Sequence, residues 1–285
     1  MSTAILGPIR HRCHTCGSGC IGTDVYVLED ERARLQEQAW KLGIEAPLSG
    51  GLVRQVERRC VFLDNENLCQ IHSRWGIDAK PRVCQQYPLS FVEVGPLQMR
   101  AAIDPGCMHA WADWRAGPEA ELKGLVVSNG RRVLEWEAEE EALLALLDPA
   151  KRRLAGILEA LEWSPSDLAE QLIGSNLDKR LLHPDTSEPI RNRLAHVATF
   201  IYGLDEPPPL RLSPVAESWG IEVVRRFLFI RASRDGRPLS QTIAMLAGVY
   251  ACGWADPAPE RFGPAISAWS RVMRTPAWKS LFEPT

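Results

Sequence analysis

Apolar residues recur every three or four positions through most of the second half of the chain, which is the spacing of amphipathic helices. The pattern predicts helices at 131–147, 151–163, 165–173, 188–202, 215–231, 240–254 and 264–273. Two of these starts carry capping residues, because Ser164 and Ser187 each place a hydroxyl just before a proline of the first turn. The second half is therefore expected to be a bundle of six or seven helices.

The first third has a different pattern, with short alternating runs between turn residues. It predicts strands at 23–28, 52–57, 90–94 and 97–103, the last two forming a hairpin. Asp30 is expected to cap a helix over 31–42 that ends at Gly43. The character of the chain changes near Arg115, where Gly117-Pro118 interrupts regular structure. The predicted fold class is α+β, predominantly α: a small Cys-rich module of residues 1–115, followed by an all-α domain of residues 116–285.

Cysteines are concentrated in the first part, and they give the sequence its clearest chemical signal. Seven of the eight lie in the predicted module, at Cys13, Cys16, Cys20, Cys60, Cys69, Cys84 and Cys107. Cys13 and Cys16 have the two-residue spacing that lets two sulfurs reach one ion, and Gly17 permits the tight turn that follows. The chain shows no secretory signal, so metal binding is favoured over disulfides. Cys252 stands alone in a predicted helix and is expected to be a packed core thiol.

The number of ligands leaves two metal chemistries open. Zinc and a cubic iron–sulfur cluster each take four protein ligands, so seven cysteines exceed one site and fall one short of two. His72 or His109 could supply the eighth ligand, while some cysteines could simply be small buried apolar residues. We therefore expect all seven cysteines to bind an iron–sulfur cluster (4Fe–4S) or zinc, and the module to depend on that metal for its fold.

Composition limits the partners. The formal net charge of −3, with 45% hydrophobic and 24% charged residues, is ordinary for a globular protein. It provides no overall field that would attract nucleic acid or an anionic membrane, and the longest apolar stretch is too short to span a bilayer. We expect a cytoplasmic protein that binds a protein partner, with no nucleic acid and no membrane.

The order of the cysteine motifs resembles a known family. CxxCGxxC, C-x-F-L, C-x-I-H, K-P-x-x-C-x-x-Y-P and a final cysteine, over about residues 11–110, resemble the YkgJ-type cysteine-cluster proteins, described as zinc- or iron-chelating. The same motifs resemble the cysteine region of flagellin lysine N-methylase (FliB type). The resemblance marks the same seven cysteines as the cluster. Two positions depart from the pattern: Gly19 replaces the first of two adjacent cysteines, and Leu89 follows Tyr87-Pro88 where the methylase has arginine.

Two hypotheses of different class follow. The first is an accessory metal protein, in which metal organises the module and the helical domain recognises a partner or substrate. The second, implied by the methylase resemblance, is an iron–sulfur-dependent protein-lysine N-methyltransferase. No separate nucleotide-binding, hydrolase or metalloprotease motif is present, so the sequence leaves catalysis open.

Overall fold

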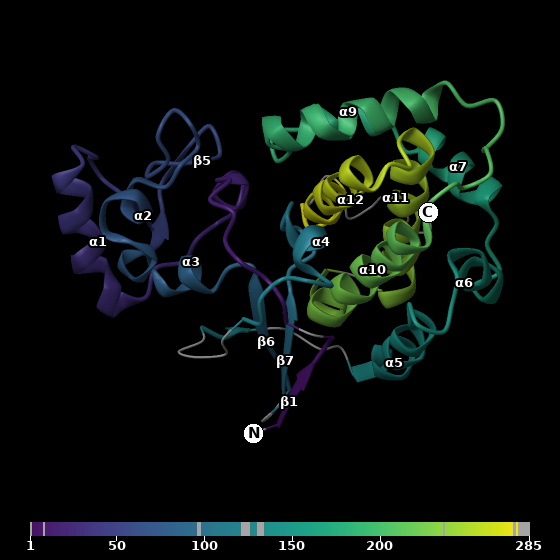
Figure 1. Cartoon of the computed structure of the whole chain (residues 1–285), viewed down its shortest axis with the longest axis horizontal. Coiled ribbons are helices and arrows are strands. Elements are labelled where there is room, and N and C mark those ends of the chain that lie inside the picture. The colour runs from purple at the N-terminus through teal and green to yellow at the C-terminus, as the bar shows by residue number, and fades with distance from the viewer. Residues whose placement is uncertain are drawn as a thin grey trace.

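The computed structural model describes residues 2–7, 9–95, 98–120, 126–129, 134–235, 237–275 and 278 of the 285-residue chain. A cysteine-rich lobe lies to one side and a helical body to the other, with a small sheet below them (Figure 1). The α+β fold class, predominantly α, is confirmed. No helix within the described ranges is both long and apolar enough to cross a lipid bilayer.

The helical body follows the apolar pattern of the second half closely. Its elements are η3 (Leu134–Trp136), α5 (Glu137–Leu146), α6 (Leu154–Ala160), α7 (Pro165–Gly174), α8 (Leu177–Leu181), α9 (Glu188–Tyr202), α10 (Pro214–Asp235), α11 (Pro238–Ala255) and α12 (Pro259–Val272). The short helix α8 was not predicted. Residues 131–133, where the first predicted helix begins, lie outside the described residues. The capping prediction at Ser164 is confirmed, since its hydroxyl accepts from the N–H of Asp167 at 3.2 Å.

The prediction for the last helix was wrong at its start, because α12 begins five residues before Pro264. That proline lies inside the helix, where it removes one backbone hydrogen bond. Phe262, Ile266 and Trp269 lie on the buried side of the helix and are each at most 1% exposed. Their burial outweighs the local cost of the proline.

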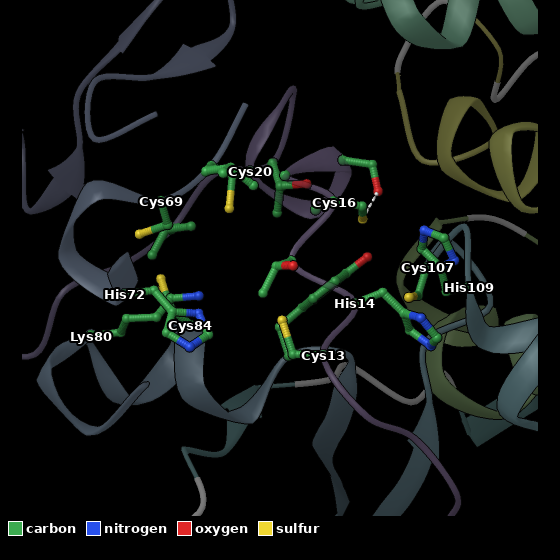
Figure 2. Close-up of a pocket in the computed structure, with 18 of the residues that line it drawn as sticks. Cys13, His14, Cys16, Cys20, Cys69, His72, Lys80, Cys84, Cys107 and His109 are labelled. Atoms are coloured by element: carbon green, nitrogen blue, oxygen red, sulfur yellow. Dashed lines mark hydrogen bonds between the residues drawn. The ribbon is translucent and has the colours of Figure 1, made fainter. Parts of the chain in front are cut away.

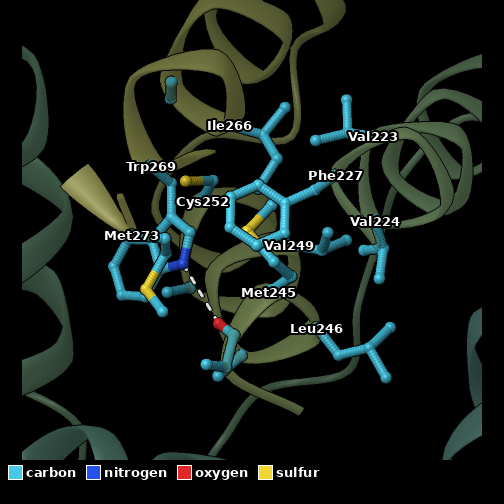
Figure 3. Packing of buried hydrophobic residues seen from close by; sticks show 14 of the residues in the cluster. Val223, Val224, Phe227, Met245, Leu246, Val249, Cys252, Ile266, Trp269 and Met273 are labelled. Atoms are coloured by element: carbon cyan, nitrogen blue, oxygen red, sulfur yellow. Dashed lines mark hydrogen bonds between the residues drawn. The ribbon is translucent and has the colours of Figure 1, made fainter. Parts of the chain in front are cut away.

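The centre of the body is formed by α10, α11 and α12, whose apolar side chains pack as in Figure 3. Nearly every residue of α11 is buried, so this helix has no polar face. A Cβ on Gly248 would lie 2.2 Å from the Trp269 ring, so the close contact between α11 and α12 requires glycine there. The indole N–H of Trp269 donates to the carbonyl of Ala244 at 3.1 Å, which fixes the ring against α11. Cys252, 1% exposed, lies in this core, as predicted.

The sheet contains β1 (Ser2–Ile5), β6 (Leu89–Gly95), β7 (Gln98–Ile103) and β8 (Ser128–Asn129), in the order β1-β7-β6-β8. β6 and β7 pair antiparallel, which confirms the predicted hairpin, while β1 runs parallel to β7. Phe91, Ala101 and Ile103 join the core of the helical body. The sheet therefore packs on the helices, although three of its four described strands come from the part of the sequence expected to form the Cys-rich module, and β8 comes from the part expected to be all-α. The division into domains at 115–118 stays a prediction.

The cysteine-rich lobe is built from short elements around a small core. They are η1 (Ser18–Cys20), α1 (Glu29–Lys41), β2 (Leu48–Ser49), β3 (Leu52–Val53), β4 (Gln55–Val56), β5 (Arg59–Cys60), α2 (Gln70–Trp75), η2 (Ile77–Ala79) and α3 (Arg82–Gln86). The short helix α4 (Ala110–Asp113) follows the sheet hairpin and lies beside α12 of the helical body. The buried apolar residues that form the lobe core are Val27, Leu35, Ala39, Val53, Phe62 and Ile71. Such a core is small for a stable independent fold.

Three local predictions in this lobe were wrong. The strand expected over 23–28 is reduced to one isolated bridge, between Tyr26 and Leu52. The strand expected over 52–57 is interrupted at Arg54, whose side chain turns to the carbonyls of Glu45 and Ala46. Asp30 is not the cap of α1; it lies in the first turn and pairs with Arg82 at 2.7 Å.

Candidate metal centre

A cavity of about 440 Å³ borders the cysteine-rich lobe, the loop that precedes α1 and the start of α4. Six of the seven predicted cysteines line it, as Figure 2 shows for these residues: Cys13, Cys16, Cys20, Cys69, Cys84 and Cys107. Cys60 does not line the cavity; it lies on β5 and packs against the core of the lobe. The structure therefore gathers the predicted cysteines around one space, from segments up to 94 positions apart in the sequence.

The first three cysteines lie on the loop that ends in η1. Gly17 adopts a left-handed conformation with φ of 63°, and its carbonyl accepts the N–H of Cys20 at 2.7 Å. A Cβ on Gly17 would lie 2.0 Å from the carbonyl oxygen of Asn67, so only glycine allows this close approach. The loop thus folds tightly against the turn that precedes Cys69.

The next three cysteines are positioned by β5, α2 and α3. Cys60 ends β5, Cys69 immediately precedes α2, and Cys84 lies within α3. The turn before Cys69 is held by the carboxylate of Asp64, which accepts the N–H groups of Glu66 and Leu68 at 2.9 Å. α3 is anchored in turn by α1, because Glu31 accepts the N–H of Arg82 at 2.8 Å.

Cys107 comes from the sheet side, between β7 and α4. It is 5% exposed, and the neighbouring backbone N–H groups of His109 and Ala110 act to lower the pKa of its thiol, against the burial that raises it. Such N–H donors stabilise a thiolate and are common around metal-bound sulfur.

Burial controls the protonation of these thiols. It raises the pKa of Cys60 and of Cys107 to about 12, and it raises the pKa of Cys20 and of Cys84 as well. At neutral pH such thiols are neutral unless a cation compensates them, so metal binding there is coupled to proton release.

Lys80 is the cation that faces these thiols. Burial alone would lower its pKa, but the neighbouring sulfurs of Cys69, Cys84, Cys20 and Cys13 raise it above the ordinary value. The residue is 7% exposed, and no carboxylate of the described residues lies within ion-pair distance of its ammonium group. A buried cation without a carboxylate partner fits a site that carries negative charge.

A cluster of imidazoles at the other end of the cavity was not predicted. The Nε2 of His14 lies 2.8 Å from Oδ2 of Asp113, and Nδ1 of His11 lies 3.1 Å from the same oxygen. The ring of His14 stacks on that of His109, with centroids 4.4 Å apart. The flanking of Cys13 by two histidines, in HRCHTC, could have indicated this cluster, whereas nothing in the sequence marks Asp113. His72 and His109, the predicted eighth ligands, both line the cavity.

Asp113 is buried and ionised beneath these rings. Its burial would raise the pKa, but the N–H of Arg12, at 3.1 Å, and the His14 ring together lower it. Burial in turn lowers the pKa of His11 to about 4, so that this imidazole is neutral at pH 7. The carboxylate therefore orients the neutral His11 imidazole rather than forming a simple ion pair with it.

The ring of Tyr87 explains why position 19 is glycine and not the cysteine of the family motif. A Cβ on Gly19 would lie 2.5 Å from Cε1 of the Tyr87 ring, so no larger residue fits there without displacing the tyrosine. Within the described parts of the chain, no three His, Cys, Asp or Glu side chains converge closely enough to hold one ion. The sulfurs are instead spread around the cavity wall.

Arg271, from the last helix of the body, holds the cysteine loop in place. Its guanidinium donates to the carbonyls of Ser18, at 2.6 Å, and Ile21, and to the hydroxyl of Thr23 at 3.0 Å. Arg274 beside it pairs with Asp104, three residues before Cys107. The helical body therefore fixes the loop on one side of the cavity and the Cys107 segment on the other.

Replacing Arg271 by alanine is expected to destabilise the protein by about 2–4 kcal/mol and to speed metal loss, because buried carbonyls lose a charged donor. Arg261→Ala is the matched control, since that arginine is 75% exposed at the start of the same helix and, among the described residues, its ion pair is with Asp256. It should cost less than about 0.5 kcal/mol. Denaturant unfolding and the rate of metal transfer to a chelator measure both effects; equal results for the two variants would contradict the role of Arg271.

Comparison with known proteins agrees with the cysteine pattern. Residues 12–108 match the model of the CxxCxxCC family, which is described as a "Putative zinc- or iron-chelating domain". No curated protein and no solved structure matches the chain. The resemblance to cysteine-cluster proteins is thereby confirmed, together with zinc or iron as the expected metal; the resemblance to flagellin methylase gains no support from these comparisons.

Proposed function

We propose that the chain chelates iron as an iron–sulfur cluster at the cavity, since residues 12–108 match the model of the CxxCxxCC family. Zinc is the alternative occupant. The observation that carries the proposal is the lining of one cavity by six thiols together with a buried lysine. The metal organises the cysteine-rich lobe, and the helical body serves for recognition of a partner or substrate.

The donor set fits a cluster. Four thiolates around an oxidised four-iron cluster, or around zinc, leave a charge of about −2 that needs nearby cations and N–H donors. Lys80 supplies the cation, and the backbone N–H groups of His109 and Ala110 near Cys107 are the available donors. When bound, a cluster would provide electron transfer or a Lewis-acidic iron, and the thiols would hold it.

Size favours a cluster over one ion. The cavity volume of about 440 Å³ lies in the range of roughly 300–1,000 Å³ that is common for small-molecule and cofactor sites. Visible absorption of anaerobically purified protein tests the proposal. A brown protein whose absorption bleaches with dithionite is expected, whereas a colourless protein with stoichiometric zinc would overturn the choice of iron.

Lys80 provides a second test, because its charge and its length can be varied separately. Lys80→Met removes the cation but keeps most of the apolar stem, so metal affinity is expected to fall about 10- to 100-fold, as for other residues that support metal ligands. Lys80→Arg keeps the charge and should retain most of the affinity. Competition with a chelator measures the affinities, and equal affinity for the methionine variant and the wild type would exclude charge compensation by Lys80.

The cavity also favours a second candidate function, an iron–sulfur-dependent protein-lysine N-methyltransferase. A structural metal site is closed, whereas the sulfurs here face a space large enough for a further ligand. Binding of S-adenosylmethionine by the cluster-loaded protein, followed by methyl transfer to lysines of a protein substrate, tests this candidate. If no binding is detected at high S-adenosylmethionine concentrations, the methyltransferase is excluded and the accessory role remains.

A protein partner for the helical body stays a prediction. Among its described residues, Leu182 is 69% exposed and Tyr202 is 42% exposed, and both provide apolar surface for such a contact.

A further inference from the structure

We propose that a second cavity, at the start of α10, binds a small anion of the phosphate type, either free phosphate or a phosphate monoester. This cavity has a volume of about 280 Å³, and none of the described residues that line it also lines the cavity of the cysteines. Four of its lining side chains are cations, those of Arg115, Lys151, Arg152 and Arg153, so we call it the basic cavity. The inference is independent of the metal.

Three separate segments bring the donors of the basic cavity together. Arg115 follows α4, and its guanidinium lies 4.7 Å from the centre of the Trp114 ring, which restrains it by a cation–π contact. The other three cations lie on the 149–153 segment that leads into α6. The beginning of α10 forms the remaining wall and contributes the hydroxyl of Ser218. The fold therefore converges hydrogen-bond donors on one space from positions distant in the sequence.

Two of the four cations are compensated by carboxylates that do not line the basic cavity. Nζ of Lys151 lies 3.1 Å from Oδ2 of Asp148. Nη1 of Arg153 lies 2.7 Å from Oε2 of Glu217. Each carboxylate also accepts a backbone N–H group of residues 150–154, at 3.0 and 2.9 Å, and is thereby fixed in place. These two ion pairs hold the shape of the cavity wall.

Arg115 and Arg152 provide the charge that is left over. Both are exposed, and within the part of the chain that the structure describes neither has a carboxylate at ion-pair distance. A phosphate monoester carries a charge of about −1.5 to −2 at neutral pH, which two arginines balance. The planar guanidinium also matches the oxygens of a phosphate group with two parallel hydrogen bonds. Charge and geometry therefore both favour a phosphate-type anion.

The rest of the lining agrees with this ligand class. No carboxylate is among the described lining residues, so nothing there would repel an anion. The positive end of α10, a helix of 22 residues, adds to the field of the arginines. The volume of about 280 Å³ lies just below the roughly 300–1,000 Å³ that is common for ligand sites, so a small ligand fits. Pro149 and Val215 provide a short apolar wall for the carbon part of a monoester.

Calorimetric titration of the full chain, purified with its metal, tests the inference. Inorganic phosphate and glycerol phosphate are the two probes, and chloride keeps the ionic strength constant. Saturable binding of one equivalent is expected, and Arg115→Gln and Arg152→Gln should each weaken it about tenfold, because a charged hydrogen-bond donor is lost. Arg211→Gln is the matched control, since Arg211 is exposed three residues before α10 but does not line the basic cavity. All three arginines are exposed, so the variants should fold; melting curves check this.

The outcomes decide between a built site and nonspecific attraction. Weakening by either cavity variant, with Arg211→Gln at the wild-type affinity, supports the site. Equal weakening in all three variants means an adventitious ion only and overturns it, as does the absence of saturable binding at millimolar phosphate. Binding of a phosphoserine peptide but of neither small probe overturns the choice of a small ligand. Iron content is expected to be the same in every variant, so the test of the proposed function is unaffected.

Discussion

Replacing Cys69 or Cys84 by serine is expected to remove most of the bound iron, at least about tenfold relative to wild type, because a neutral hydroxyl is a poor substitute for a thiolate. Both residues line the cavity, and Lys80 lines it beside them. Loss of either thiolate leaves an incomplete ligand set and an uncompensated lysine. Iron and acid-labile sulfide per chain, measured after anaerobic purification, give the result.

The control is Cys252→Ser. This thiol is 1% exposed in the core of the helical body, away from the cavity. Its replacement buries a hydroxyl and is expected to cost about 1–3 kcal/mol of stability while metal content stays at the wild-type level. Equal metal loss from the Cys69, Cys84 and Cys252 variants would show that the cysteines are divided wrongly between metal and core.

Removal of the metal is expected to unfold most of the cysteine-rich lobe while the helical body stays folded. The core cluster of the lobe contains six buried apolar residues, which is few, whereas structural zinc contributes about 10–16 kcal/mol in small metal-dependent folds. Amide hydrogen exchange after chelation should show loss of protection over residues 13–86. α10, α11 and α12 should remain protected, and they serve as the internal control.

Residues 89–113 are expected to behave like the helical body in this experiment. Their strands and Cys107 share its core, and Arg100 on β7 is bound to Glu140 on α5 and to the carbonyl of Phe229 on α10. The sequence predicts that the whole segment 1–115 depends on metal for its fold. The structure restricts this prediction to residues 13–86. Near-native protection over residues 13–86 after complete chelation would contradict metal-coupled folding.

The helical body could be predicted from the sequence because long helices repeat their apolar spacing many times. α9 was predicted at its observed bounds, Glu188–Tyr202. The start of α12 was missed because local sequence rules place a proline at the beginning of a helix or outside it. In the structure the helix continues through Pro264, because tertiary packing buries Phe262 and Trp269 on either side of it. The short strands of the lobe were missed for a related reason, since two-residue pairs such as β4 and β5 carry no periodicity.

The cysteines of the candidate site could be predicted because thiols at such spacing are rare and chemically specific. The contribution of the residues that support these cysteines could not be predicted from the sequence. Asp113 is an ordinary acid in the sequence, and it becomes significant only where α4 brings it 2.8 Å from His14. Arg271 lies 251 positions beyond Cys20, and no local pattern connects it to the cysteine loop. Gly19 was recognised as a departure from the family motif, but its cause, the packed ring of Tyr87, is visible only in three dimensions.

The most direct test of the central claim is metal analysis of the wild-type chain, purified without air. Iron, zinc and acid-labile sulfide are measured on the same sample, since zinc is redox-silent and brings no sulfide, whereas a cluster contains both iron and sulfide. The account predicts iron and sulfide in about equal amounts, near four of each per chain for a four-iron cluster. Stoichiometric zinc with no sulfide would contradict the iron–sulfur proposal and leave a zinc-chelating protein.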